Sequence, residues 1–348
     1  MTSQENVAPR ADRTPPPAWV RLTGLTVALG AVLVVLLALF ILPSLKSGPH
    51  DLALGVVGTT ENAAALQQQL DTASPDAFDV VAVATLDELH TQVSERDLAG
   101  GLAVTDTEVT SVVASAGGTA ISGTVTSTAT QVARAAGLDV VVDDVVPLPA
   151  EDPSGIGIGG LAFPLVFGGI VPVVAFRTVF PRSAAGRIAG ITAFSLVGGL
   201  IVSAVLQFWF GSTDGVFLQV AGAMALGIAA LAFPLAGLQE VLGGKGFTIG
   251  AASMMFLGNP LAGIATTGAW LPAGIGTFGQ ILPPGATGSL VRSAAYFDFA
   301  GGAVAGLTLA CWVIIGAGLL AVGAVRGTTT TDAGADTDAD TNAAPITA

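Results

Sequence analysis

The side chains that could carry chemistry are few and stand far apart in the sequence. Neither of the two histidines, His50 and His90, stands at metal-like spacing from a second ligand. Asp143 and Asp144 are adjacent, so in a strand their carboxylates would point to opposite faces and could not act together. No nucleophile stands in a recognisable catalytic turn. The sequence therefore predicts a protein that is not an enzyme, with no metal site and no cofactor.

Two glycine-rich stretches match nucleotide-binding motifs in part, but their surroundings do not fit. Residues 155–160 match the dinucleotide fingerprint, yet they follow a proline-rich segment and open an apolar run, with no βαβ unit around them. Residues 243–246 resemble the end of a phosphate-binding loop, but Gln239 replaces its first glycine and Gly246 its magnesium-binding serine or threonine. Any ATP-driven step would therefore need a separate subunit.

Long apolar runs dominate the chain and must position whatever site it has. Of its 348 residues, 52% are hydrophobic and only 11% are charged. A bilayer core of about 30 Å needs about 20 apolar residues in a helix. Six runs are long enough, which predicts a polytopic α-helical membrane protein with six transmembrane helices. The runs are 22–43, 156–176, 188–210, 215–238, 246–265 and 299–325.

The stretch between the first two runs has the pattern of a soluble domain. Apolar segments of strand length alternate with helical patterns, which predicts a small α/β extracytoplasmic domain between helices one and two. The expected strands are 52–58, 78–84, 101–104, 109–115 and 140–146. The expected helices are 62–70, one led by Asp87, and 119–136. At about 110 residues such a domain can bury its own core.

The predicted domains follow from these patterns. They are a disordered cytosolic leader (1–21), the first transmembrane helix (22–43), the α/β domain (44–154), a five-helix membrane domain (155–326) and a disordered acidic cytosolic tail (327–348). The first apolar run is longer than that of a signal peptide and no cleavage-site pattern follows it, so we expect a retained anchor. The net charge of −13 lies mostly in the α/β domain and the tail, where it favours solvation and gives no surface for nucleic acid.

The basic residues predict the orientation in the membrane. Lysine and arginine near helix ends favour the cytosol. With both termini cytosolic, eight of the twelve basic residues lie inside: Arg10, Arg13, Arg21, Arg177, Arg182, Arg187, Lys245 and Arg326. Lys46, Arg96, Arg134 and Arg292 remain outside. The opposite orientation would reverse this count.

The connection between the second and third helices, 176–187, is short, basic and partly apolar. Its arginines are explained by the preference of basic loops for the cytosol. The alternative is a short cytosolic helix or elbow that presses on a partner domain. The candidate residues for that contact are Arg177, Phe180, Arg182 and Arg187.

The fifth apolar run and the connection after it are unusual. Asn259 and Pro260 should kink or break the run, because proline has no backbone donor and disfavours helix before it. The following segment, 271–297, is too apolar for a solvated loop and too rich in glycine and proline to span. We expect re-entrant or interfacial half-helices there, with Trp270, Tyr296 and Phe297 at headgroup depth. The candidate residues are Asn259, Pro260, Gln280, Pro283, Pro284, Arg292 and Asp298, with an Arg292–Asp298 pair possible only across a bend.

With these parts, the chain resembles the membrane subunit (permease) of ABC type-2 exporters, and more narrowly the bacterial YhgE/Pip (phage infection protein) group. The resemblance rests on the one-plus-five layout, on the segment 144–153 that ends the α/β domain, and on Gly279-Gln-Ile-Leu-Pro-Pro-Gly-Ala286, followed by Arg292 and 296–298. It implies that 177–187 occupies the coupling position that meets an ATP-binding subunit. It also implies that 271–297 lies near the exit.

The resemblance implies a multi-pass permease subunit in the bacterial cytoplasmic (plasma) membrane. It would form a homo- or heterodimer with another membrane subunit, consistent with small residues such as those of 302–306 on helix faces. ATP hydrolysed by a separate subunit would drive export of an amphiphilic or apolar compound. The alternative is a non-transporting envelope receptor, scaffold or assembly protein that displays its extracytoplasmic domain.

Overall fold

The computed structural model describes residues 17–45, 48–264, 267–271 and 274–341. The chain divides into two compact units, residues 1–42 and 43–348. The first unit contains most of helix α1 (Ala18–Leu45), whose stretch Ala18–Ile41 is apolar enough to cross a membrane. This helix begins four residues before the predicted start at Leu22. The rest of the predicted leader, residues 1–16, lies outside the described residues.

Among the described residues, five helices are long and apolar enough to cross a membrane, so the chain is a multi-pass membrane protein. They are Ala18–Ile41, Ala162–Val179, Ala184–Trp209, Phe217–Gly258 and Ala303–Val325. The fourth covers most of the fourth predicted run (215–238) and most of the fifth (246–265). The prediction of six spans is therefore not confirmed by this count.

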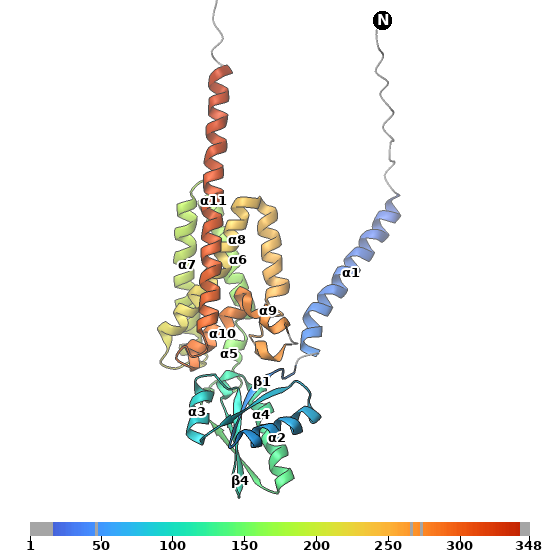
Figure 1. Ribbon diagram of the computed structural model, residues 1–348. Coiled ribbons are helices and arrows are strands. Elements are labelled where there is room, and N and C mark those ends of the chain that lie inside the picture. The colour runs from blue at the N-terminus through green and yellow to red at the C-terminus, as the bar shows by residue number, and fades with distance from the viewer. Residues whose placement is uncertain (1–16, 46–47, 265–266, 272–273, 342–348) are drawn as a thin grey trace, which may run out of the picture. The chain divides into compact units, whose positions relative to one another are not determined.

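The fourth long helix, α8 (Phe217–Ser253) with the π-helical turn η3 (Met254–Gly258), does not run straight (Figure 1). At 1.5 Å per residue its 42 residues would extend about 63 Å, about twice the bilayer core. Gly243 has non-helical backbone angles (φ 67°, ψ −156°), and the chain turns back there. The two arms touch: a β-carbon on Gly250 would lie 2.9 Å from the side chains of Leu235 and Leu238.

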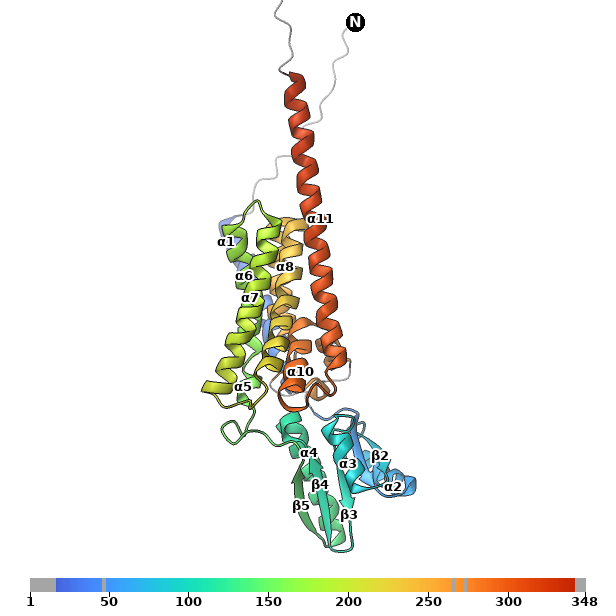
Figure 2. The same cartoon turned by 90° about the vertical axis from the view of Figure 1, so that its left-hand side faces the viewer.

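The other predicted runs also differ in detail from the helices. The second run contains the short helix α5 (Ile156–Gly159) and α6 (Ala162–Val179), and the third is α7 (Ala184–Ala204), continued by the π-helical turn η2 (Val205–Trp209). The predicted fifth run ends as a helix at Gly258 instead of Ala265, because Pro260 cannot donate a backbone hydrogen bond. Figure 2 shows α6, α7 and α8 packed together.

The last helix, α11 (Ala303–Thr341), continues well beyond the predicted end of the sixth run. The tail was predicted to be disordered from 327, but helix is described to Thr341. No proline occurs between 327 and 341, so nothing there blocks the backbone hydrogen bonds of a helix. Residues 342–348 of the predicted tail lie outside the described residues.

A five-stranded sheet lies between α1 and α5 in the sequence, with strand order β2-β1-β3-β4-β5. β1 (Leu52–Val57) pairs in parallel with β2 (Phe78–Val83) and β3 (Gly100–Val104). β4 (Glu108–Val113) is antiparallel to β3, and β5 (Asp139–Asp144) is parallel to β4. The predicted α/β region is confirmed, and each expected strand overlaps an observed one.

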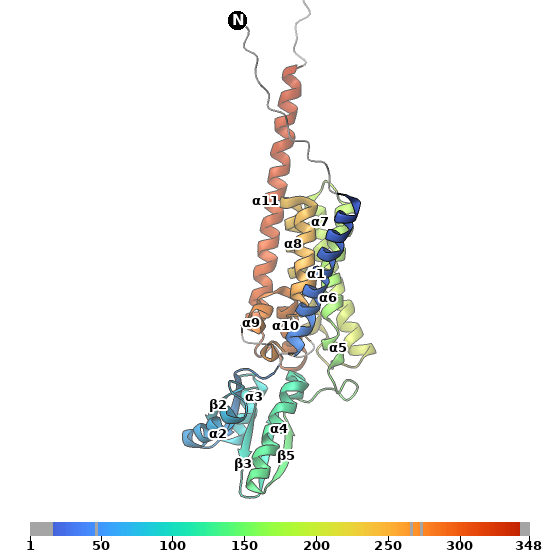
Figure 3. The ribbon, with the colours of Figure 1, turned by 90° about the vertical axis from the view of Figure 1, so that its right-hand side faces the viewer.

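Helices cover both faces of this sheet. Successive side chains of each strand point to opposite faces, and apolar side chains occur on both. On β1, Leu54 belongs to the core under α2 (Thr60–Ala73) and α4 (Thr119–Ala136), with Leu66 and Val125. Its neighbour Ala53 packs on the opposite core, which includes Leu89 of α3 (Leu86–Ser94). Figure 3 shows α4 along the β4–β5 half of the sheet. A single 3₁₀ turn, η1 (Ser115–Gly117), precedes α4.

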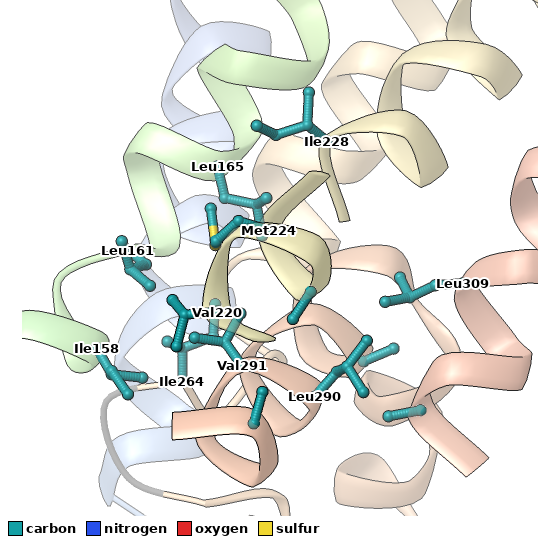
Figure 4. Close-up of a cluster of buried hydrophobic side chains, with 14 of the residues drawn as sticks. Ile158, Leu161, Leu165, Val220, Met224, Ile228, Ile264, Leu290, Val291 and Leu309 are labelled. Atoms are coloured by element: carbon teal, nitrogen blue, oxygen red, sulfur yellow. The ribbon is translucent and has the colours of Figure 1, made fainter. Parts of the chain in front are cut away.

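The core of the helical region is built around the first arm of α8. Val220, Met224 and Ile228 of this arm meet Leu165 of α6, as Figure 4 shows. Val291 and Leu290 come from α10 (Pro283–Tyr296), and Leu309 comes from α11. Twelve of the fourteen residues of α10 are buried. A helix that is neither long enough to span nor exposed to solvent thus completes the core.

Candidate functional sites

The connection between α6 and α7 is a tight elbow of four residues, 180–183. Ser183 caps α7, and its hydroxyl accepts a hydrogen bond of 3.0 Å from the Gly186 amide. The Phe180 ring lies over Gly186, where a β-carbon would come within 2.8 Å of the ring. It also stacks on Phe176, with 6.4 Å between ring centroids. The elbow is therefore a defined turn, without the short helix that was one of the two expected forms.

A cluster of three charged residues fixes the base of this elbow. Glu240, in the first arm of α8, accepts a hydrogen bond of 2.6 Å from Arg177 of α6 and another of 2.6 Å from Arg187 of α7. Arg187 also donates to the Pro181 carbonyl at 3.2 Å, which ties the turn itself to the cluster. The side chains of Arg187 and Glu240 are 9% and 12% exposed, against 41% for Arg177.

The four candidate residues of the elbow thus have different surroundings. Arg177 and Arg187 face inward, to Glu240. Phe180 is 38% exposed, and Pro181 and Arg182 are also exposed. We define the tip of the elbow as residues 180–182, which are all exposed and therefore available to a partner. Glu240 could not be predicted from the sequence, because it is 53 and 63 positions away from the two arginines that it binds.

The second candidate region forms two short helices, α9 (Ile275–Ile281) and α10, joined at Leu282. Pro283 and Pro284 occupy the first positions of α10, where the amide that proline lacks would have no helical partner. Gln280 donates to the Ala262 carbonyl at 3.0 Å and accepts a hydrogen bond from Ser289. Gln280 therefore joins α9, α10 and the turns that follow α8.

Asn259 and Pro260 lie in these turns, directly after η3. The predicted break at this point is where the helix ends. Asn259 is 9% exposed, and its carbonyl accepts a hydrogen bond from the Ala262 amide at 3.3 Å. The two residues therefore mark the change from the second arm of α8 to the turns that lead to α9.

Arg292 and Asp298 do not form the pair that was considered. Arg292, 8% exposed, donates to the Ile264 carbonyl at 2.8 Å. Asp298 instead accepts a hydrogen bond from Gln219 at 3.3 Å. Its φ of 45°, followed by 68° at Phe299, places two consecutive side-chain-bearing residues in the left-handed region. That bend directs Asp298 toward α8.

Phe297, which was expected at headgroup depth, is buried against the sheet domain. It is 6% exposed and packs in the sheet core that contains Leu89 and Val93. The Arg96 guanidinium lies 5.0 Å from the centroid of its ring and donates to the Ser293 hydroxyl at 3.3 Å. Burial lowers the pKa of Arg96. Sequence reasoning missed this joint, since Arg96 and Ser293 are 197 positions apart.

The described residues contain no group of three or more histidine, cysteine, aspartate or glutamate side chains that could hold a metal ion. His90 does have a partner that the sequence did not indicate, since its Nε2 lies 2.9 Å from Asp143 Oδ2. This pair ties α3 to β5. No family model, curated protein or solved structure matches the chain.

Proposed function

We propose that this chain is the membrane-spanning permease subunit of an ATP-driven exporter for an amphiphilic or apolar compound. A separate ATP-binding subunit supplies the energy, and two membrane subunits form a homo- or heterodimer in the bacterial cytoplasmic membrane. The observation that carries the proposal is the elbow at 180–183, in which an inward charge cluster holds a basic and aromatic tip outward.

A braced elbow suits the transmission of force. Arg177 and Arg187 connect α6, α7 and α8 through one carboxylate, so a push on the tip reaches three helices together. A loop that only fixes the orientation of the protein in the membrane needs positive charges, but it does not need ion pairs that connect three helices. The exposed Phe180 and Arg182 provide an apolar contact and a charge, which is the composition of a protein–protein contact.

The topology that goes with this function has six spans and cytosolic termini. In it the two arms of α8 each cross the bilayer, and Lys245 at their turn lies in the cytosol together with the elbow. α9 and α10 then form the re-entrant segment on the outer side, next to the extracytoplasmic domain.

The test is co-purification. The tagged protein, extracted gently from its native membrane, should retain a stoichiometric ATP-binding subunit that mass spectrometry identifies. Phe180→Ala with Arg182→Glu should release that subunit without lowering the abundance of the protein. Arg134→Glu, at an exposed arginine of α4, is the matched control and should not release it. Arg187 is unsuitable for this test because its loss would disturb the cluster.

If no ATP-binding subunit is retained in several mild detergents and in nanodiscs, the proposal fails. The display or assembly role would then be the better account. Most of the core on each face of the sheet comes from the sheet domain itself, as a displayed module requires.

A further inference from the structure

A cavity of about 680 Å³ lies between the α5–α6 segment and the C-terminal end of α7 with η2. Most of its wall is apolar and comes from residues such as Leu161, Pro164, Ile201 and Leu206. The π-helical turn η2 forms part of this wall. Such turns are rare and occur often at functional sites, because the wider turn displaces side chains from their usual positions.

One end of this cavity is polar and carries negative charge. Glu151, Asp152 and Ser212 line it. Asp152 is 7% exposed, and its carboxylate accepts hydrogen bonds of 2.8 Å from the amides of Ile156 and Gly157. Within the described parts of the chain, neither Asp152 nor Glu151 forms an ion pair.

Ser212 provides an independent sign of a missing ligand. It is 1% exposed, and its hydroxyl has no hydrogen-bond partner among the described groups. The hydroxyl and the Asp152 carboxylate meet beside Gly157: a β-carbon there would lie 2.0 Å from Ser212 Oγ and 3.0 Å from Asp152 Oδ2. Buried polar groups without partners are uncommon and costly. A ligand group at this end of the cavity would satisfy them.

Aromatic side chains stand at the same cavity. Trp209 and Phe210, which also line it, are 80% and 51% exposed, and their rings are 6.1 Å apart. The faces of such rings attract organic cations, tryptophan most strongly. Two carboxylates, a free hydroxyl and aromatic faces therefore all favour positive charge. The apolar wall excludes a strongly hydrated metal ion but accepts a hydrocarbon body.

We propose that this cavity binds a cationic amphiphile, with its positive group at Glu151, Asp152 and Ser212 and its apolar body along α6 and α7. The inference names the substrate class of the proposed exporter and in that respect rests on the proposed function. Binding itself requires no ATP-binding subunit, so the cavity is tested separately from the transport role.

The test uses two ions of the same shape and opposite charge. Tritiated tetraphenylphosphonium should bind saturably to the full-length protein in phosphatidylglycerol nanodiscs, above the level in empty discs. Tetraphenylborate should not. Glu151→Gln should weaken tetraphenylphosphonium binding about tenfold, as expected for loss of one favourable charge contact. Glu95→Gln, at an exposed carboxylate next to α3, should leave it unchanged.

Two further measurements test the polar end of the cavity. Gly157→Ala places a methyl group between Ser212 and Asp152 and should also weaken binding about tenfold, a change of about 1.4 kcal/mol. Thermal unfolding of each variant shows whether it is folded. Equal binding of tetraphenylborate, or unchanged binding by both folded variants, would overturn the proposal. Displacement of tetraphenylphosphonium by phosphatidylethanolamine in the discs would also overturn it, since the occupant would then be a lipid headgroup.

Discussion

Glu240 balances two arginines that come from different helices. A carboxylate accepts hydrogen bonds on both oxygens, and here each oxygen serves one guanidinium. The cluster keeps one net positive charge, which lies toward the more exposed Arg177. Such a group needs all its members, because a buried charge that loses its partner is costly.

Glu240→Gln should therefore lower the free energy of unfolding by about 3 kcal/mol, since it leaves the buried Arg187 without a counter-charge. Arg177→Gln should cost less, because Arg177 is 41% exposed and the Arg187–Glu240 pair remains. Thermal unfolding of the purified protein in detergent measures both. Equal losses in the two variants would contradict the assigned roles.

The elbow shows which features of a site can be predicted from the residue types alone. Its basic and aromatic character was evident from the residue types between 176 and 187. That Arg187 faces inward and Arg182 outward was not, because this difference depends on the partner supplied by α8. Pairings between distant residues have no local signal in a single sequence.

Among the elements, α9 and α10 pack so closely on their neighbours that their glycines contact backbone carbonyl groups. A β-carbon on Gly279 would lie 1.8 Å from the Leu261 carbonyl oxygen, and one on Gly285 would lie 2.2 Å from the Gly279 carbonyl oxygen. Only glycine allows such contact. Glycine at these positions lets α9 pack its buried face on the turn after α8 and lets α10 pack on α9, which longer side chains would prevent.

Gly279→Ala should consequently destabilise the protein, because the methyl group must displace backbone. We expect a loss of about 2 kcal/mol, within the range for overpacked cores. Gly222→Ala in α8 is the control, since nothing lies within 4 Å of the added carbon, and it should be neutral or slightly stabilising. Hydrogen exchange in α9 and α10 should rise only in the first variant. Unchanged exchange there would refute the close packing.

The elements themselves were predictable to different degrees. The strands and helices of the sheet domain follow from local alternation, and α4 begins and ends where the pattern placed it, at Thr119 and Ala136. The boundaries in the apolar part were less certain. Hydrophobicity alone does not distinguish a continuous helix from one that turns back at Gly243 or stops at Gly258.

For the whole molecule, the joint at Phe297 connects the sheet domain with the helical core. Phe297 directly follows α10, which is buried against α8 and α11, and its ring belongs to the core of the sheet domain. Arg96 covers the ring and reaches back to Ser293 of the same helix. A movement of α10 would therefore be passed to the domain.

Phe297→Ala should loosen this joint, at a cost of about 3 kcal/mol for the removed aromatic ring. Hydrogen exchange should increase in α3 and in the strands beneath it, which share the core with Phe297. Phe299→Ala is the matched control, because Phe299 is 43% exposed. Equal exchange profiles in the two variants would show that the ring does not hold the domain.

The position of β5 at the edge of the sheet has a consequence for how copies of this chain meet. Its outer edge has no strand partner, and Val141 and Val142, which point to opposite faces, are 43% and 53% exposed, so the edge could recruit a strand from a neighbour. In an antiparallel copy, the register that places Val141 opposite Val141 also places Asp139 opposite Asp143, and the register that places Val141 opposite Val142 places Asp139 opposite Asp144. In these registers the repulsion disfavours edge-to-edge pairing of two copies, and so it protects the sheet edge from aggregation.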